Sequence, residues 1–428
     1  MFGSDNSKRI SIVSGYRTPF VSSGTVFREF SSLDLGKIIT VELVNRSEID
    51  HREIDQIIFG NVIPTIKSPN LSREISLRAG LPSSVNASTV SQACLSFFGA
   101  ITTAANNIYC GDSEVIIVGG TESISNMPVL FSSGLRDALF DSIKAKNSLK
   151  KASSFLNLTL KDLKPDIPEI AEFSTGKPLG FDAEKIARVE HVSREEQDEY
   201  SQRSHDLASQ FFINHKYKDE IIKVFLPPDF AESVYSDTGV RTDSNLEGLS
   251  ELKPIFDKNY GTVTAGNSST LADGAAAMLI MSQEKANSLG YDPLGHIRSY
   301  AFSGISPLDM LLSGPDYSTP IALKRAGLSI EDIDLIEIHE AFASQAISNL
   351  RTLSSHLASK TGANDIEEII TKVNVNGGSI AIGHPFSATG GRLVIGLLNE
   401  MKRMDKEFGL VISCAAGGLG FSMILERN

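Results

Sequence analysis

The chain has 428 residues, 41% of them hydrophobic, and its 40 basic and 52 acidic residues give a formal net charge of −12. This length suits two domains or one large α/β body with a sizeable core. The acidic balance argues against a nucleic-acid partner, because phosphate backbones require a clustered basic surface. A local basic patch can still bind a small anionic ligand.

The three cysteines, Cys94, Cys110 and Cys414, are too few and too far apart for a disulfide framework or a zinc ribbon. We therefore expect no metal site. The first residues lack the pattern of a secretory signal or a transit peptide, and no run of about 18 apolar residues predicts a transmembrane helix. These features favour a cytoplasmic location; a mitochondrial-matrix protein without its transit peptide would look the same.

Short β-type runs alternate with helical stretches, which predicts a mostly parallel sheet covered by helices. The run at 114–120 is continuously apolar after Glu114 and closed by glycines, as is typical of a strand buried on both faces. The two halves share a similar rhythm without a repeat of fixed period. The runs expected to form strands are 9–13, 55–62, 87–90, 114–120, 335–338, 373–375 and 410–414.

The segment from about 131 to 247 differs in character and is interpreted as an insertion between core strands. Residues 144–164 hold six lysines and one acid, Asp162. Apolar residues recur there every three or four positions, which predicts a helix with one apolar face, packed on the protein's own body or on a partner or membrane surface. Its members are Leu149, Ala152, Leu156, Leu160 and Leu163. The capping-box pattern at 193–196 predicts another helix, through about Ala208.

Cys94 follows the strand run at 87–90 and precedes a helical run at 95–105, which places it at a helix N-terminus. There, unpaired amide groups and the helix dipole favour the thiolate, which is the nucleophilic form. The alternative is a buried structural cysteine. Cys110, just before Gly111 at an expected helix C-terminus, is interpreted as structural.

His384 lies in a glycine-rich segment at 376–392. Glycines let the backbone turn tightly and approach a ligand closely. A histidine held in such a loop, just ahead of a helix, is suited to act as a general base. The alternative is a histidine that only pins the loop by hydrogen bonds.

His339 follows the strand run at 335–338, at a carboxyl end where open α/β sheets gather ligand groups. In its neutral form it can donate a hydrogen bond to a developing oxyanion. The helix after it is expected to open at Glu340, which either orients neighbouring groups or favours the helix start.

Cys414 ends the run at 410–414 and enters a glycine-rich turn. A thiol there is suited to exchange protons close to the backbone amides of Ala416 and Gly417. A core cysteine on a buried hairpin is the alternative. The run at 262–277 is rich in small side chains, which leave room for a long ligand or allow tight packing.

Together these motifs resemble the thiolase family over nearly the whole chain. The similar segments are 16–20, the surroundings of Cys94, 264–269, 339–342, 383–385 and 414–418. The more similar branch is the β-subunit of the fatty-acid oxidation trifunctional complex. His339 stands where most thiolases have asparagine, Ala416 stands in a run where many thiolases have three glycines, and 173–187 also resembles that branch.

The resemblance implies an α/β protein with a duplicated thiolase fold, in five αβαβα layers, and an inserted loop domain over the coenzyme A site. The expected N-terminal domain is 1–130 with 248–283, the inserted loop domain is 131–247, and the C-terminal domain is 284–428. The last boundary falls in a loop with Gly290 and Pro293.

The resemblance also implies a division of roles. Cys94 attacks a 3-ketoacyl-CoA after losing its proton to His384, while the amides of Cys94 and Ala416, with Gly417 beside them, hold the oxyanion. Cys414 protonates the departing acetyl-CoA enolate, which His339 and His384 stabilise. Coenzyme A is a substrate here, and no resident cofactor is expected.

Positions matching coenzyme A contacts in the family are Ser269, Ala341 and Phe342. The implied activity is 3-ketoacyl-CoA thiolysis in fatty-acid β-oxidation, and an acetoacetyl-CoA-forming biosynthetic thiolase is the alternative. A β-ketoacyl synthase fits less well because it lacks a second catalytic cysteine. An inactive scaffold subunit is disfavoured because all four reactive residues are present.

The implied partners are acyl-CoA and coenzyme A, a second copy in a homodimer, and an α-subunit with hydratase and dehydrogenase activities in an α2β2 assembly. The lysine-rich segment at 144–164 is the expected docking element or point of peripheral membrane contact.

Overall fold

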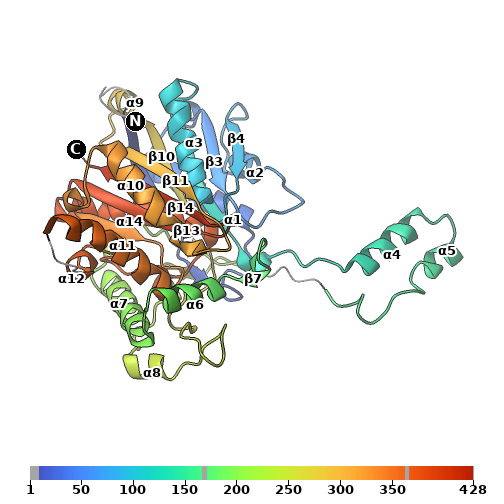
Figure 1. Ribbon diagram of the computed structural model, residues 1–428. Helices are drawn as coiled ribbons and strands as arrows, with labels where there is room; N and C mark the ends of the chain where they lie inside the picture. Colours follow the sequence, from blue (N-terminus) through green and yellow to red (C-terminus); the bar gives the residue numbers. More distant parts are fainter. Residues whose placement is uncertain (1–8, 166–170, 362–365, 428) are drawn as a thin grey trace. The chain divides into compact units, whose positions relative to one another are not determined.

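The computed structural model describes residues 9–165, 171–361 and 366–427 (Figure 1). The chain divides into two compact units: Met1–Asn126 with Glu172–Asn428, called the body below, and Met127–Ala171, called the 127–171 unit. No helix within the described ranges is long and apolar enough to cross a membrane. The domain boundaries expected near 130, 247 and 283 stay predictions.

A 10-stranded mixed sheet runs through the body in the order β12-β13-β14-β11-β1-β10-β5-β3-β4, with β2 paired to β10. The strands confirm six of the seven expected runs. They are β1 (Ile10–Arg17), β2 (Val21–Ser22), β3 (Gln56–Gly60), β4 (Asn86–Val90), β5 (Val115–Glu122), β10 (Ala272–Ser282), β11 (Gly295–Gly304), β12 (Leu335–Ile338), β13 (Phe408–Ala415) and β14 (Leu419–Glu426).

The expectation of a mostly parallel sheet is wrong. Among the strands of this sheet in the described residues, β3 runs parallel to β4 and β5, and β12 runs parallel to β13. In contrast, β1, β10, β11 and β14 pair antiparallel with their neighbours. Part of the reason is local, because the turn at 416–418 between β13 and β14 is too short for a crossover and permits only an antiparallel hairpin.

Three apolar clusters separate the layers of the body. The first cluster packs α1 and α2 on the outer face of β3, β5 and β10. The second cluster holds α3 and α14 between the two halves of the sheet. The third cluster packs α10 and α11 against β11–β14. These layers confirm the predicted αβαβα fold. The helices are α1 (Ser32–Ser47), α2 (Leu71–Arg78), α3 (Ser96–Cys110), α9 (Gln283–Ser288), α10 (Gly314–Ala326), α11 (Ala343–Thr361), α12 (Ile366–Ile370), α13 (Ser379–Ile382) and α14 (Thr389–Met404).

The two halves of the sheet repeat one strand order. If the strands of each half are numbered as they occur along the chain, both halves place them side by side in the order third, second, fourth, fifth, first. This order is β4-β3-β5-β10-β1 in one half and Val373-β12-β13-β14-β11 in the other. The strand expected at 373–375 is wrong, because only Val373 forms a bridge, to Ile336. Asn374 turns the chain with a φ of 46°. The repeat accounts for the duplicated fold.

From Ala171 to β10 the chain forms an added set of short elements. The capping box at Ser193 and Glu196 is present, and its helix continues past Ala208 to Ile213. The added elements are β6 (Ala171–Glu172), β7 (Lys177–Pro178), α6 (Gly180–Val189), α7 (Arg194–Ile213), β8 (Val224–Phe225), β9 (Ser233–Val234) and α8 (Leu246–Ser250).

A buried ion-pair cluster fastens this insertion to the sheet. Arg17 of β1 is fully buried and donates to Asp237 at 2.7 Å and to Glu220 at 2.9 Å. The backbone amide of Phe20 donates to the same Asp237 carboxylate at 2.7 Å. The motif at 16–20 therefore has a structural explanation.

The 127–171 unit contains α4 (Ser133–Lys144) and α5 (Ser148–Ser153), so the continuous helix expected over 144–164 is wrong. Asn147 caps α5 by accepting from the Lys150 amide, and the chain turns after Ser153. Asp162 binds the amide and hydroxyl of Thr159, a local polar contact that competes with helix formation. The apolar residues after Ser153 consequently lie in turns.

Candidate active site

Cys94 lies in the turn between β4 and α3. The preceding residue, Ala93, has a φ of 49°, in the left-handed region that non-glycine residues rarely adopt. Ser96 holds this turn, since its hydroxyl donates to the Ala93 carbonyl at 2.6 Å and accepts from the Gln92 amide at 2.8 Å. The turn places the cysteine immediately before the helix, as expected.

His384 takes the equivalent place in the second half, between the Val373 bridge and α14. Gly383 ahead of it has a φ of 104°, and a side chain there would come within 3.0 Å of the Ala272 Cβ. The His384 amide donates to the Thr270 carbonyl at 2.8 Å. Because α3 and α14 share the central layer, the duplicated fold brings Cys94 and His384 together.

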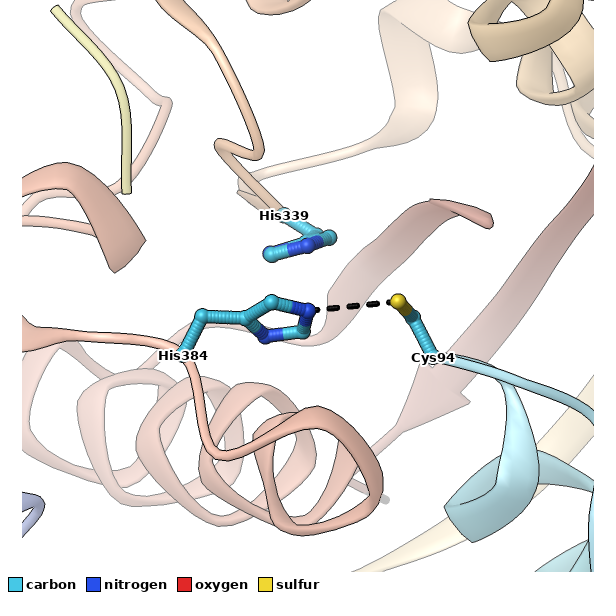
Figure 2. A group of neighbouring side chains, drawn as sticks. All are labelled: Cys94, His339 and His384. Atoms are coloured by element: carbon cyan, nitrogen blue, oxygen red, sulfur yellow. Dashed lines mark hydrogen bonds between the residues drawn. The ribbon is translucent and has the colours of Figure 1, made fainter. Parts of the chain in front are cut away.

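Figure 2 shows His384 pointing at Cys94, with the tilted ring of His339 beside it. The His384 Nε2 is 3.2 Å from the Cys94 Sγ, and its Nδ1 is 2.7 Å from the Thr389 hydroxyl. The ring centroids of His339 and His384 are 4.1 Å apart. Three reactive residues from three distant parts of the sequence thus meet in one cluster.

His339 follows β12, and its Nδ1 lies 2.9 Å from the Ser379 hydroxyl. Its Nε2 is buried and has no hydrogen-bond partner among the described residues. The expected helix start at Glu340 is wrong, since α11 begins at Ala343. The intervening residues pair with a neighbouring segment instead, since the Ala341 carbonyl accepts from the Ser269 amide at 3.0 Å and Phe342 forms a bridge to Ser268.

Glu340 orients neighbouring groups, which was one of the two alternatives. Its buried carboxylate accepts from the Ser204 hydroxyl at 2.8 Å, the Asn374 amide group at 2.6 Å, the Tyr200 hydroxyl at 3.1 Å and the Ile380 amide at 3.1 Å. It therefore ties α7 to the loop ahead of His384.

Cys414 lies near the end of β13 with only 1% of its surface exposed. The backbone amide of Ala416 lies near enough to the Cys94 sulfur to lower the pKa of that thiol, so the turn after β13 reaches the nucleophile. The Gly417 amide instead donates to the Glu172 carboxylate at 2.6 Å. Of the two expected oxyanion donors in this turn, only Ala416 is directed at Cys94.

The three expected coenzyme A contacts lie side by side. Ser269 bonds to Ala341 through the backbone, and Phe342 pairs with the adjacent Ser268. Ala341 and Phe342 are half-buried and pack on an apolar cluster that includes Cys414. This surface offers an apolar wall that leads to the second cysteine.

Burial governs protonation at the site. Burial raises the pKa of the Cys94 thiol to about 12, against hydrogen bonds from the Ala416 and Cys94 amides that lower it. Burial lowers the pKa of His384 to about 3, and the charge of Arg392 lowers it further. The expectation that the helix N-terminus favours the thiolate is wrong for this resting site, because desolvation outweighs the amide donors.

The two remaining reactive groups are also neutral at pH 7. Burial lowers the pKa of His339 well below its usual value, and the charges of His384 and Arg392 lower it further. Burial raises the pKa of the Cys414 thiol, and a negative charge on Cys94 raises it further. The site therefore rests as two thiols and two neutral imidazoles, the forms needed for a general base, a general acid and a hydrogen-bond donor.

The ligand atoms of Cys94, His339 and His384 lie within 4.8 Å of one another, and in the described part of the chain they form the one cluster of this kind near enough to hold a metal ion. Sulfur and imidazole nitrogen are donors that zinc accepts. Our expectation of no metal stays a prediction.

Residues 10–284 match the family model for the thiolase N-terminal domain, and residues 291–427 match that for the thiolase C-terminal domain. The chain belongs to the thiolase family. This thiolase is 45% identical over 424 residues to a 3-ketoacyl-CoA thiolase of Pseudoalteromonas translucida, covering 98% of this chain and 97% of that one. It is 44% identical over 423 residues to a 3-ketoacyl-CoA thiolase of Shewanella amazonensis, with the same coverage.

Solved thiolase structures have the same fold. An acetyl-CoA acetyltransferase of Bacillus anthracis superposes with a TM-score of 0.85 at 30% identity, covering 98% of both chains. Human mitochondrial 3-ketoacyl-CoA thiolase gives 0.85 at 29% identity, covering 99% of both chains.

Sequence reasoning missed the side chains that hold the two histidines of this thiolase. Ser379 and Thr389 bond to His339 and His384, and Arg392 donates to Ser379. All three lie in the glycine-rich segment at 376–392, which was singled out only for its glycines and its histidine. A serine or threonine in a loop has many possible partners, so the sequence carries no signal for these contacts.

Proposed function

We propose that this thiolase cleaves 3-ketoacyl-CoA with coenzyme A, giving acetyl-CoA and an acyl-CoA shortened by two carbons, as in fatty-acid β-oxidation. The observation that carries the proposal is the Cys94–His384 pair at 3.2 Å, with the Ala416 amide directed at the same sulfur. The relatives at 44–45% identity that are named 3-ketoacyl-CoA thiolase support it.

In the first step His384 accepts the proton of the Cys94 thiol, and the sulfur attacks the C3 carbonyl carbon of the substrate. A neutral imidazole with a low pKa does not hold a proton at rest, so it is available as the base. The amides of Cys94 and Ala416 then donate to the oxyanion that forms on the C3 oxygen.

In the second step the oxyanion collapses and the bond between C2 and C3 breaks. The acyl group stays on Cys94, and the acetyl-CoA enolate leaves and takes a proton at C2 from Cys414. The Nε2 of His339 and the protonated His384 face this region and stabilise the enolate oxygen. Expelling a carbanion is difficult, so donors already in place lower the barrier.

In the last step the thiol of free coenzyme A returns a proton to Cys414 and attacks the acyl carbonyl. The Cys94 sulfur leaves and recovers its proton from His384, which restores the resting site. A thioester suits this exchange because a thiolate is both a good nucleophile and a good leaving group. Ser269, Ala341 and Phe342 are proposed to contact the coenzyme A part of each substrate.

The proposal is tested by CoA-dependent cleavage of 3-ketoacyl-CoA substrates of short, medium and long chain, with Cys94→Ala as the control. Cleavage that increases with chain length and is absent in the variant supports a degradative thiolase. Activity confined to acetoacetyl-CoA would assign the protein to the biosynthetic type instead, an alternative supported by the likeness to an acetyl-CoA acetyltransferase. Failure to cleave any chain length contradicts both.

We further propose a homodimer core, and an α2β2 assembly with a hydratase and dehydrogenase α-subunit. β4 supports the dimer, since it is the terminal strand of the sheet and four of its five residues are half-buried. A terminal strand presents backbone groups on its outer side, which makes it a site for pairing with another chain.

We also propose that the lysine-rich segment at 144–164 makes peripheral contact with an anionic membrane surface. Leu149, Leu156 and Leu160 are 85%, 80% and 87% exposed, an unusual state for leucine. Exposed apolar residues flanked by lysines bind anionic lipid surfaces by both apolar insertion and charge attraction.

A further inference from the structure

The histidine at 339 raises a question that the catalytic scheme leaves open. A neutral imidazole carries one proton, on Nδ1 or on Nε2, and only the Nε2–H form can donate into the space shared with Cys94 and His384. The tautomer is set by whatever binds the other nitrogen, which here is the Ser379 hydroxyl at 2.9 Å.

Ser379 is fully buried, and within the described part of the chain its hydroxyl has two side-chain partners. One is the His339 Nδ1, and the other is the Arg392 guanidinium, whose Nη2 lies 3.3 Å away. An arginine can only donate. The serine oxygen is therefore an acceptor toward Arg392, and its own proton remains to be placed.

His339 Nδ1 is the partner that can take this proton. With the proton on Nδ1 instead, the serine oxygen would face two donors and its own hydrogen would be left unpaired in a buried place, which is unfavourable. With Nδ1 bare, the Ser379 hydroxyl donates to His339 and accepts from Arg392, so both of its contacts are satisfied.

Glu337 holds the arginine in this orientation. The Arg392 Nη1 lies 3.3 Å from the Glu337 carboxylate, and both side chains are almost fully buried. Burial raises the pKa of Glu337 to about 8, and the charge of Arg392 opposes this. Whether Glu337 is protonated or ionised, Arg392 donates to both Glu337 and Ser379.

From this geometry we propose that Ser379, backed by Arg392 and Glu337, is a positioning residue that fixes His339 as the Nε2–H tautomer, and so turns it into a hydrogen-bond donor for the enolate oxygen. The donor atom is then the His339 nitrogen that is buried and unpartnered among the described residues. His384 takes the opposite form, with Nδ1–H donating to Thr389 and Nε2 accepting from Cys94. Two neighbouring histidines thus have opposite tautomers, one acting as a base and the other as a hydrogen-bond donor.

The inference rests on the proposed thiolysis, and a double-mutant cycle tests it. Ser379→Ala is expected to lower kcat by about 10–100-fold with KM changed less than about twofold, the usual cost of removing a group that orients a functional histidine. In a His339→Asn background the same change is expected to cost under about threefold, because an asparagine amide donates without a tautomer. Ser318→Ala, which removes another buried hydroxyl, bonded to Ser422 at 2.8 Å, is the matched control.

Equal losses of kcat in both backgrounds would show that Ser379 acts only through folding and would overturn the proposal. No loss of kcat in the wild-type background would overturn it as well.

A second measurement does not depend on activity. Nitrogen-15 NMR of histidine-labelled protein distinguishes protonated from bare ring nitrogens, and the His339 signals are those lost in His339→Asn. We expect the His339 Nε2 to be protonated. A protonated Nδ1 would overturn the inference even if thiolysis is confirmed. If the protein does not catalyse thiolysis, the NMR result still decides which tautomer His339 adopts.

Discussion

At the scale of single residues, the reactivity of Cys94 is controlled by its partner and not by a low pKa. The thiol keeps its proton because burial outweighs two amide donors, and His384 is neutral for the same reason. The nucleophile is generated only when substrate is present and the proton moves to the imidazole. A resting thiol of this kind is protected from oxidation, which requires the thiolate.

This state predicts a distinctive pH dependence of alkylation. With a raised pKa of about 12, the thiolate fraction of Cys94 is small at pH 7 and increases about tenfold per pH unit. The rate of iodoacetamide labelling at Cys94 is therefore expected to increase steadily from pH 7 to pH 10, followed by mass spectrometry of its peptide. The exposed Cys110 in the same sample serves as a control for reagent quality and labelling efficiency. A plateau for Cys94 below pH 8 would indicate a thiolate–imidazolium pair and contradict the account.

At the scale of elements, the site depends on how closely α3 and α14 approach in the central layer. A Cβ at Gly390 of α14 would lie 2.8 Å from the Phe97 Cβ of α3, closer than real side chains come. Gly390→Ala is expected to separate the two helices and to lower the free energy of unfolding by about 1–3 kcal/mol. It should also lower kcat, since the turns before these helices carry Cys94 and His384.

Gly396→Ala in the same helix is the matched control. Its Cβ would meet only the Glu220 carboxylate, at an ordinary 3.7 Å. Alanine there should leave activity unchanged and add roughly 0.5–1 kcal/mol of stability, the usual gain over glycine within a helix. Urea denaturation and steady-state kinetics measure both variants; equal stability for the two would show that the approach at Gly390 is not tight.

The elements also show what the sequence could predict. Six expected strands were accessible because strand runs are apolar. Cys94, His339 and Cys414 could be named as candidates because they follow such runs, and His384 because it lies in a glycine-rich segment. The direction of each strand could not be predicted from the sequence, because it depends on which strands become neighbours in the sheet. Contacts such as Ser379 with His339, 40 positions apart, arise only when β12 and α13 pack in the folded chain.

The helix expected over 144–164 failed for a related reason. Its apolar spacing was correct, but helix-capping and turn residues such as Asn147 and Asp162 interrupt it. The spacing of apolar residues shows which face of a helix they would occupy. It does not show whether local side-chain hydrogen bonds to the backbone prevent that helix from forming.

At the scale of the whole molecule, the 127–171 unit is compact by itself, and its Leu149, Leu156 and Leu160 are exposed. Replacing Leu149, Leu156 and Leu160 together by serine is expected to leave thermal stability and thiolysis unchanged but to reduce binding to vesicles that contain one-third phosphatidylserine. Binding should also weaken with salt, because the lysines act through charge. Co-sedimentation measures it.

Ile213→Ser is the control for that experiment, because Ile213 is 63% exposed but lies on α7 in the body. Equal vesicle binding by the triple variant and the wild-type protein would remove the membrane proposal. If the triple variant still binds vesicles but no longer co-purifies with an α-subunit, the segment at 144–164 is a docking element.

The measurement that tests the central claim most directly is isolation of the acyl-enzyme. The protein is mixed with 3-ketodecanoyl-CoA without free coenzyme A, quenched in acid and digested, and the acylated peptide is identified by mass spectrometry. The account predicts one equivalent of acetyl-CoA released and an octanoyl group on Cys94. It predicts formation slowed about 10²–10⁴-fold in His384→Ala and absent in Cys94→Ser. Acylation of another residue, or steady turnover by Cys94→Ser, would contradict it.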